Sequence, residues 1–214
     1  EVSLFDLLKE TFRQNPDYVV VGEVRGKETY VLFQGMASGH SSFSTFHAAS
    51  IETLVRRLET RPISLPASLV ESLNIICSLL HIKDQRKNVR RLRALEEVIR
   101  VRQKVGEVES NTVFEWDPIN DSVLRHGKSV VLEKASKMTG VPIQSFEKEL
   151  LLRASLLRKM HEQNISNYKE FTQIVNEYYK NKQAVLKRFG ISGAETSVKG
   201  QSQLKKAEPI TTQK

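Results

Sequence analysis

One glutamate and two histidines are the side chains whose types and spacing could carry chemistry. Residues 17–25 read DYVVVGEVR and residues 36–49 read MASGHSSFSTFHAA, so Glu23 follows one apolar run, and His40 and His47 flank a second, shorter one. A β-branched run that stops at a glycine is typical of a strand buried on both faces. A carboxylate directly after such a strand lies at the edge where α/β sheets bind ligands.

Glu23 has two readings at this position. Its carboxylate could order a Mg²⁺-bound water or take a proton from an attacking water, and Arg25, two residues on, could meet phosphate charge. The same two side chains could instead form a salt-bridged turn without a chemical role. The segment alone favours neither reading.

The two histidines are predicted to lie at opposite ends of a strand over residues 42–46. Five residues of strand reach roughly 17 Å at about 3.3 Å per residue, so His40 and His47 are too far apart to share one metal. No cysteine lies near either ring, and a zinc site is therefore not predicted.

A polar rim fits the histidine segment better than a hydrolase site does. Ser42 and Ser44 lack the glycine frame of a nucleophile elbow. We expect Gly39 and the Ser/Thr hydroxyls to lie beside Glu23, with His47 donating to a phosphate or a substrate-bound water. A purely structural role for a lone histidine remains the alternative.

Length and composition indicate a globular protein whose uninterrupted apolar runs are short. The chain has 214 residues, of which 39% are hydrophobic and 27% charged, and its longest apolar runs are too short to span a bilayer. Its single cysteine, Cys77 in NIICSLL, is predicted to be a small core residue and allows no internal disulfide. Because Glu1 opens directly inside a helical pattern, we expect a piece of a longer or processed chain.

Charge is unevenly distributed along the chain. Residues 1–82 carry 7 Lys/Arg against 9 Asp/Glu, whereas residues 83–214 carry 26 against 16. Residues 83–104 alone hold nine basic and three acidic side chains, and alternation along a strand would form one cationic face suited to phosphates or an acidic partner. Aromatic residues do not interleave there, so nucleic acid is not expected as a partner.

The elements that must position these side chains alternate in the first part of the chain. Helices are predicted over residues 3–12, 28–38 and 50–59 and from residues 64–66 onward, and strands over 17–21, 42–46 and 74–82. This alternation predicts α/β layers around a parallel sheet. Gly39 is expected to close the second helix as its C-cap.

The later part of the chain changes character. Strands over residues 89–101, 111–117 and 122–125, with a turn at 118–121, predict antiparallel hairpins. Helices follow from residue 131: one with the apolar stripe Phe146, Leu150, Ala154, Leu157 and Met160, and one starting at Asn167. The tail after Phe189 has no periodicity and is predicted to be disordered.

Two long motifs carry a resemblance to a known family. PDYVVVGEVR resembles the atypical Walker B of the secretion ATPase superfamily, and GHSSFSTFHA resembles its histidine box. That superfamily includes the ATPases of type II secretion, type IV pilus assembly and archaellum assembly. NTVFEWDP and the closing LKRF resemble archaeal members most closely, and the resemblance covers about residues 3–189.

The resemblance implies a fold and a set of roles. It implies part of a RecA-like P-loop NTPase motor domain over residues 1–130, followed by a helical subdomain over 131–189 and a basic tail over 190–214. Glu23 would be the Walker B acid, which holds Mg²⁺ through a water, and His47 the catalytic histidine. Further phosphate or subunit-interface contacts are predicted at Arg13, Gly22, Arg25, His40, Thr45, Arg56 and Arg57.

The resemblance also implies ligands, partners and a cellular location. The full-length protein would bind ATP and Mg²⁺ as a hexameric ring in the cytoplasm, at the inner face of a membrane, and would act with a membrane platform protein. The sequence holds no G-x-x-x-x-G-K-[ST] loop, whose backbone amides and lysine cradle phosphates. A non-catalytic module, either a truncated motor that docks on partners or a basic nucleic-acid binder, therefore stays the alternative to an ATPase.

Overall fold

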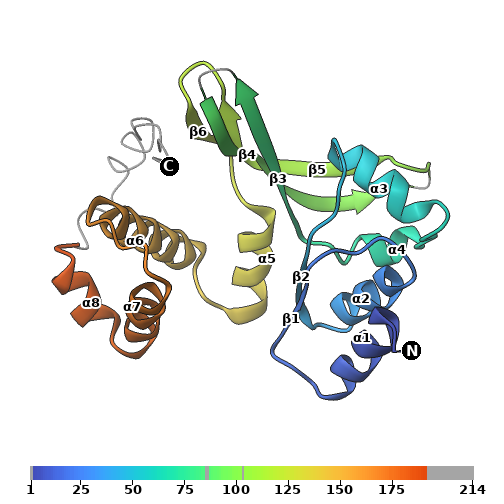
Figure 1. The fold of residues 1–214 in the computed structure, drawn as a ribbon, viewed down its shortest axis with the longest axis horizontal. Coiled ribbons are helices and arrows are strands. Elements are labelled where there is room, and N and C mark those ends of the chain that lie inside the picture. The colour runs from blue at the N-terminus through green and yellow to red at the C-terminus, as the bar shows by residue number, and fades with distance from the viewer. Residues whose placement is uncertain (1, 85–86, 103, 192–214) are drawn as a thin grey trace. The chain divides into compact units, whose positions relative to one another are not determined.

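The computed structural model describes residues 2–84, 87–102 and 104–191, which form two compact units (Figure 1). The first unit comprises residues 2–117 and 125–130, and the second comprises residues 118–124 and 131–191. Of the tail predicted to be disordered, residues 192–214 lie outside the described residues.

The first unit begins with two helices packed beside a small parallel sheet. Helix α1 (Leu4–Arg13), strand β1 (Tyr18–Val21), helix α2 (Glu28–Ala37) and strand β2 (Ser41–Ser44) follow in chain order, and β1 and β2 pair in parallel. Gly35 lets α2 approach α1, because a Cβ at this position would lie 2.1 Å from the ring of Phe12. The predicted alternation of helix and parallel strand is thus confirmed.

Only one face of this parallel sheet is buried by the described residues. Val19 and Val21 join a core with residues of α1 and α2, whereas Tyr18 and Val20 are 67% and 76% exposed. The prediction that this run is buried on both faces is therefore wrong for the described chain. The exposed face also carries Phe43, whose ring centroid lies 6.3 Å from that of Tyr18.

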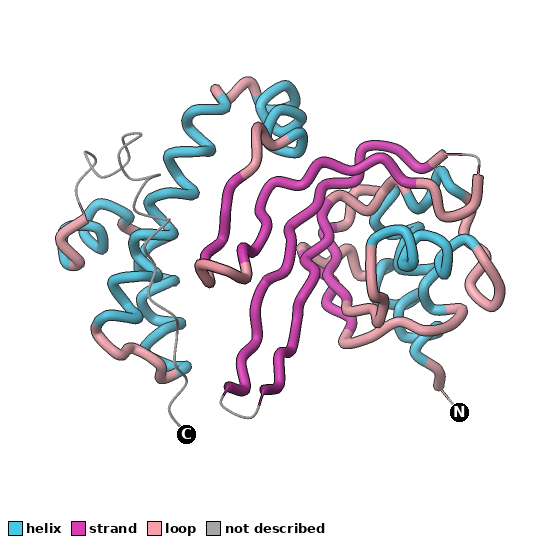
Figure 2. The backbone as a smooth tube through the Cα atoms, turned by 90° about the horizontal axis from the view of Figure 1, so that it is seen from above, coloured by secondary structure: helices cyan, strands magenta, loops and turns pink. Residues whose placement is uncertain are grey.

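A four-stranded antiparallel sheet follows in the chain (Figure 2). After α3 (Ile51–Glu59) and the short α4 (Ala67–Val70) come β3 (Ile75–Asp84), β4 (Lys87–Val101), β5 (Val108–Asp117) and β6 (Ser122–Arg125), in the sheet order β3-β4-β5-β6. The antiparallel strands predicted over residues 89–125 are confirmed. The strand predicted over residues 74–82 does not join the parallel sheet, because β3 pairs antiparallel with β4. Cys77 is exposed, because it lies on the opposite face of β3 from Ile76, which packs against the core, so its prediction as a core residue is wrong.

Pairing of β3 with β4 divides the basic segment between two faces. Arg90 pairs with His81, and the next residue, Arg91, pairs with Leu80. Successive residues of a strand point to opposite faces. These two arginines therefore lie on opposite faces, so the basic side chains of this segment do not all share one face.

A buried carboxylate on β4 ties the sheet to the start of α5 (Val130–Thr139). Glu97 is 2% exposed and accepts hydrogen bonds from the Val130 amide at 2.7 Å, from Asn111 Nδ2 at 3.0 Å and from the Ser129 hydroxyl. Placing a carboxylate at a helix N-terminus satisfies an amide that has no partner within the helix.

The second unit is built from α6 (Ile143–Glu162), α7 (Tyr168–Lys180) and α8 (Lys182–Arg188). Asn167 caps α7 by accepting from the amides of Lys169 and Glu170, as its position predicted. Of the stripe predicted on α6, Met160 is buried and Phe146 is partly buried. The prediction is wrong for the other three residues, since Leu150 and Leu157 are about half exposed and Ala154 is also exposed. The buried face of α6 consists of Leu152, Leu156 and Met160.

The core of this unit also holds a polar contact. Glu149 accepts hydrogen bonds from the Tyr178 hydroxyl at 2.9 Å and from Arg153 Nε at 2.9 Å, and Lys182 Nζ lies 2.8 Å from its other oxygen. Burial, and then the bond to Glu149, raise the pKa of Tyr178 to about 12.

Among the described residues, no helix combines the length and hydropathy that crossing a membrane requires.

Candidate functional site

Glu23 lies two residues beyond β1, and its carboxylate is held by Arg25. Arg25 Nε donates to one carboxylate oxygen at 2.7 Å and its Nη2 donates to the other at 2.6 Å. This two-pronged pairing lowers the pKa of Glu23, with the Arg25 hydrogen bond as the largest cause. Glu23 is thus ionised at neutral pH and poised to act as an anion.

Glu28, the first residue of α2, fixes the turn that carries Arg25. One of its carboxylate oxygens accepts from the backbone amides of Arg25 at 2.7 Å and Gly26 at 2.8 Å. Partial burial raises the pKa of Glu28, but hydrogen bonds from backbone amides outweigh it, so the net pKa lies below its ordinary value. The backbone of Arg25 is therefore held, while its side chain is 75% exposed.

The loops after β1 and β2 are joined to each other. The Thr45 hydroxyl donates to the carbonyl of Gly22, and the carbonyl of Thr45 accepts from the amide of Val24 at 3.3 Å. These bonds end β2 at Ser44, two residues before the predicted end, because Thr45 turns its polar groups to the neighbouring loop. They also bring the residues after both strands to one place.

His47 completes this arrangement from the second loop. Its Nε2 lies 3.4 Å from Glu23 Oε1, and its side chain is 84% exposed. Arg57 of α3 donates to the carbonyl of His47, and its guanidinium carbon lies 4.8 Å from the ring centroid of Phe46. Glu23, Arg25 and His47 therefore meet at one solvent-facing place, and Arg57 holds the backbone of His47.

Three predicted site residues make their contacts elsewhere. Arg13 pairs with Glu10 along α1 at 2.9 Å. The His40 ring packs edge-on against Phe12 at 5.0 Å, and both of its nitrogens are buried without a hydrogen-bond partner among the described residues. Arg56 lies beside Gly106 in the β4–β5 hairpin, where a Cβ would come within 3.0 Å of its Nε.

Two positioning residues are missing from the sequence-based prediction. Glu28 holds the turn of Arg25, and Phe46 supports Arg57. A signal for Glu28 was present, since an acidic residue in the first turn of a helix commonly accepts from amides before it. Phe46 gave no such signal, because an aromatic next to a histidine is equally consistent with core packing.

The oxygen-bearing side chains of this site could hold a magnesium ion in only one way, through bound water. Among the described residues, no group of three His, Cys, Asp or Glu side chains could enclose a metal. Mg²⁺ in nucleotide sites is commonly held by one or two carboxylates, waters and substrate phosphates. Glu23, with a hydroxyl of Thr45 in the adjoining loop, suits that mode and would hold the ion through water.

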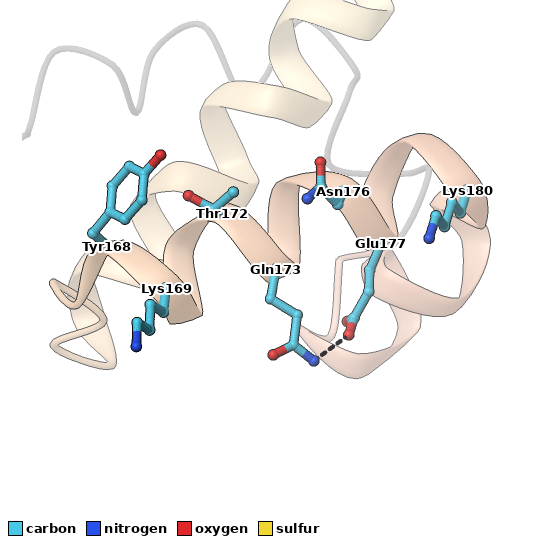
Figure 3. Close-up of a pocket in the computed structure, with 7 residues that line it drawn as sticks. All are labelled: Tyr168, Lys169, Thr172, Gln173, Asn176, Glu177 and Lys180. Carbon is cyan, nitrogen blue, oxygen red and sulfur yellow. Dashed lines mark hydrogen bonds between the residues drawn. The ribbon is translucent and has the colours of Figure 1, made fainter.

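A second surface feature lies on α7 of the second unit. The outer face of α7 forms a shallow polar hollow, on which Gln173 Nε2 donates to Glu177 Oε1 at 2.8 Å (Figure 3). Its lining residues are Tyr168, Lys169, Thr172, Gln173, Asn176, Glu177 and Lys180. A single helix face without an enclosing wall is not shaped to hold a small ligand.

Fold and site together define an α/β protein with an acidic and basic cluster beyond the carboxyl ends of two parallel strands. Residues 1–188 match the family described as type II/IV secretion system protein, and the chain belongs to that family of secretion NTPases. The resemblance read from the two motifs is thereby confirmed.

The chain is also similar to individual proteins. It is 35% identical to one uncharacterized protein of Methanocaldococcus jannaschii over 178 residues, which are 83% of this chain and 66% of that protein. A second uncharacterized protein of that organism is 35% identical, over 83% of this chain and 33% of its own length. The type IV secretion system protein PtlH of Bordetella pertussis is 41% identical over 58 residues, 27% of this chain and 17% of that protein. The chain thus spans a third to just under two thirds of the lengths of the first two relatives.

Proposed function

We propose that this chain supplies the Walker B acid, the histidine and the arginines of an ATP-hydrolysing motor that drives protein secretion or the assembly of a pilus or archaellum filament. The observation that carries the proposal is the meeting of Glu23, Arg25 and His47 beyond two parallel strands. Ligands of α/β proteins bind at that edge of the sheet.

Each residue has a task in this proposal. Glu23 orients the attacking water and accepts its proton, and its ionised state at neutral pH suits it to that task. His47, which is exposed beside Glu23, donates to a γ-phosphate oxygen. Arg25 and Arg57 offset phosphate charge. A bound Mg²⁺ would neutralise charge that develops on the phosphates.

The whole protein is proposed to work as a hexameric ring at the cytoplasmic face of a membrane, with a membrane platform protein as partner. The RecA-like part comprises residues 1–130 and the helical subdomain residues 131–189 in this proposal. ATP binding by this chain alone is expected to be weak, because a phosphate-cradling glycine loop does not occur in its sequence.

Two measurements test the proposal. Mn²⁺·ATP added to the ¹⁵N-labelled chain should broaden the side-chain NMR signals of Arg25 and His47 at millimolar concentration, and calorimetry should detect no micromolar site. In a polypeptide that also supplies the glycine-rich loop, Glu23→Gln should retain nucleotide while abolishing turnover. Normal turnover in that variant would remove Glu23 from the mechanism.

The missing glycine loop favours a second candidate, a non-catalytic module that docks on partners or binds nucleic acid through its basic half. Mobility shifts with generic DNA across a salt series separate the two. Tight binding that weakens steeply with salt would support the nucleic-acid module.

A further inference from the structure

Arg25 and Glu23 form a two-pronged pair that engages both carboxylate oxygens. Both carboxylate oxygens of Glu23 accept from the guanidinium, at 2.7 and 2.6 Å. A carboxylate held in this way has its best acceptor directions taken by Arg25. The proposed function requires Glu23 to face a water and Arg25 to face a phosphate, and the two-pronged geometry that Arg25 now gives to Glu23 is the one it would give to a phosphate.

The turn around Arg25 is built so that the side chain can move without the backbone. The Arg25 and Gly26 amides are both anchored on Glu28. The guanidinium has Glu23 as its one hydrogen-bonding partner among the contacts of the described residues, and it is 75% exposed. A planar guanidinium binds carboxylate and phosphate with the same two-pronged geometry. A polyphosphate can therefore replace Glu23 at Arg25 without reshaping the turn.

We propose that Arg25 is a switch between two anions, closed on Glu23 when no phosphate is present and transferred to phosphate when one arrives. The proposal rests on the proposed function, since it assumes that phosphates bind beside His47. Its consequence is that the carboxylate of Glu23 becomes available to a water only after a phosphate has occupied the site. The closed pair thus protects against unproductive positioning of water in the empty site.

Competition between anions gives the switch a measurable signature. Sodium tripolyphosphate, in EDTA to exclude metals, is titrated into the chain while the Arg25 Nε and His47 ring signals are followed by NMR. Glu23→Gln weakens the hold on Arg25 and should tighten tripolyphosphate binding by about threefold, the size expected for losing one exposed ion pair. Glu177→Gln is the matched control, because Glu177 pairs with Arg188 at 3.2 Å in the helical unit, and it should leave the affinity unchanged.

A double-mutant cycle separates the switch from simple loss of negative charge. The gain from Glu23→Gln must disappear in an Arg25→Gln background, whereas relief of repulsion would persist there. A gain that persists, or equal affinities of wild type and Glu23→Gln with both signals still moving, overturns the switch and leaves the proposed phosphate site standing. If neither signal moves in wild type or in any variant, the proposed site and the switch both fail.

Discussion

Replacing Glu97 tests how much one buried carboxylate contributes to stability. Glu97→Leu removes the acceptor of the Val130 amide, of the Ser129 hydroxyl and of one Asn111 N–H, although Asn111 keeps its bond to the Lys128 carbonyl at 2.9 Å. Hydrogen bonds to charged groups contribute about 1.5–3 kcal/mol each, and burying the leucine offsets part of the loss. We expect a net loss of about 3 kcal/mol in the free energy of unfolding, against about 1 kcal/mol for Glu97→Gln, which retains an acceptor.

Urea unfolding followed by the fluorescence of the single tryptophan, Trp116, measures both variants. Glu96→Leu is the matched control on the same strand. Burial raises the pKa of Glu96, and Glu52 nearby raises it further, so its charge opposes folding at neutral pH and its removal should leave stability unchanged or increase it. Equal free energies of unfolding for Glu97→Leu and Glu97→Gln would refute the reasoning, because they would show that the donors around residue 97 do not need an acceptor there.

Three further outcomes follow from the contacts described above. Because the pKa of Tyr178 rises from 10.0 to about 12 on folding, the free energy of unfolding should fall between these pH values by about 1.4 kcal/mol per pH unit, and alkaline urea titrations of Tyr178→Phe should lack this component. Gly35→Ala drives a methyl group into the ring of Phe12 and should cost about 1–3 kcal/mol in thermal unfolding, part of which Phe12→Leu recovers. Glu28→Ala removes the acceptor of two consecutive amides, whose hydrogen exchange should become about tenfold faster by NMR, with no change for amides of α7 as the control.

Local sequence patterns predicted the ends of helices well where a residue type strongly favours one backbone conformation or one capping role. Asn167 caps its helix as expected, and Gly39, with φ at 95°, lies one residue beyond Ser38, which is the C-cap of α2 in its place. Burial was harder to predict, because it depends on partners distant in the chain. The apolar run around Cys77 was read as core, but only the face of β3 that carries Ile76 packs against the core, and Cys77 lies on the other face.

The candidate site was partly accessible from the sequence. Glu23 and His47 were selected because each follows a strand, and the pairing of β1 with β2 places them 3.4 Å apart. His40 could not be separated from His47 by residue type or spacing. Its contact with Phe12, twenty-eight residues earlier in the chain, depends on how α1 packs on α2, which periodicity does not specify.

Helix α3 connects the loop of His47 with the β4–β5 hairpin through neighbouring residues of its last turn. Arg57 holds the His47 carbonyl, and Glu59 accepts from the Gly106 amide at 2.7 Å. A nine-residue helix is stiff on the scale of these contacts. The loop of His47 and the β4–β5 hairpin are therefore both held by side chains of one short helix, a connection between them that does not use the strand pairing of the sheet.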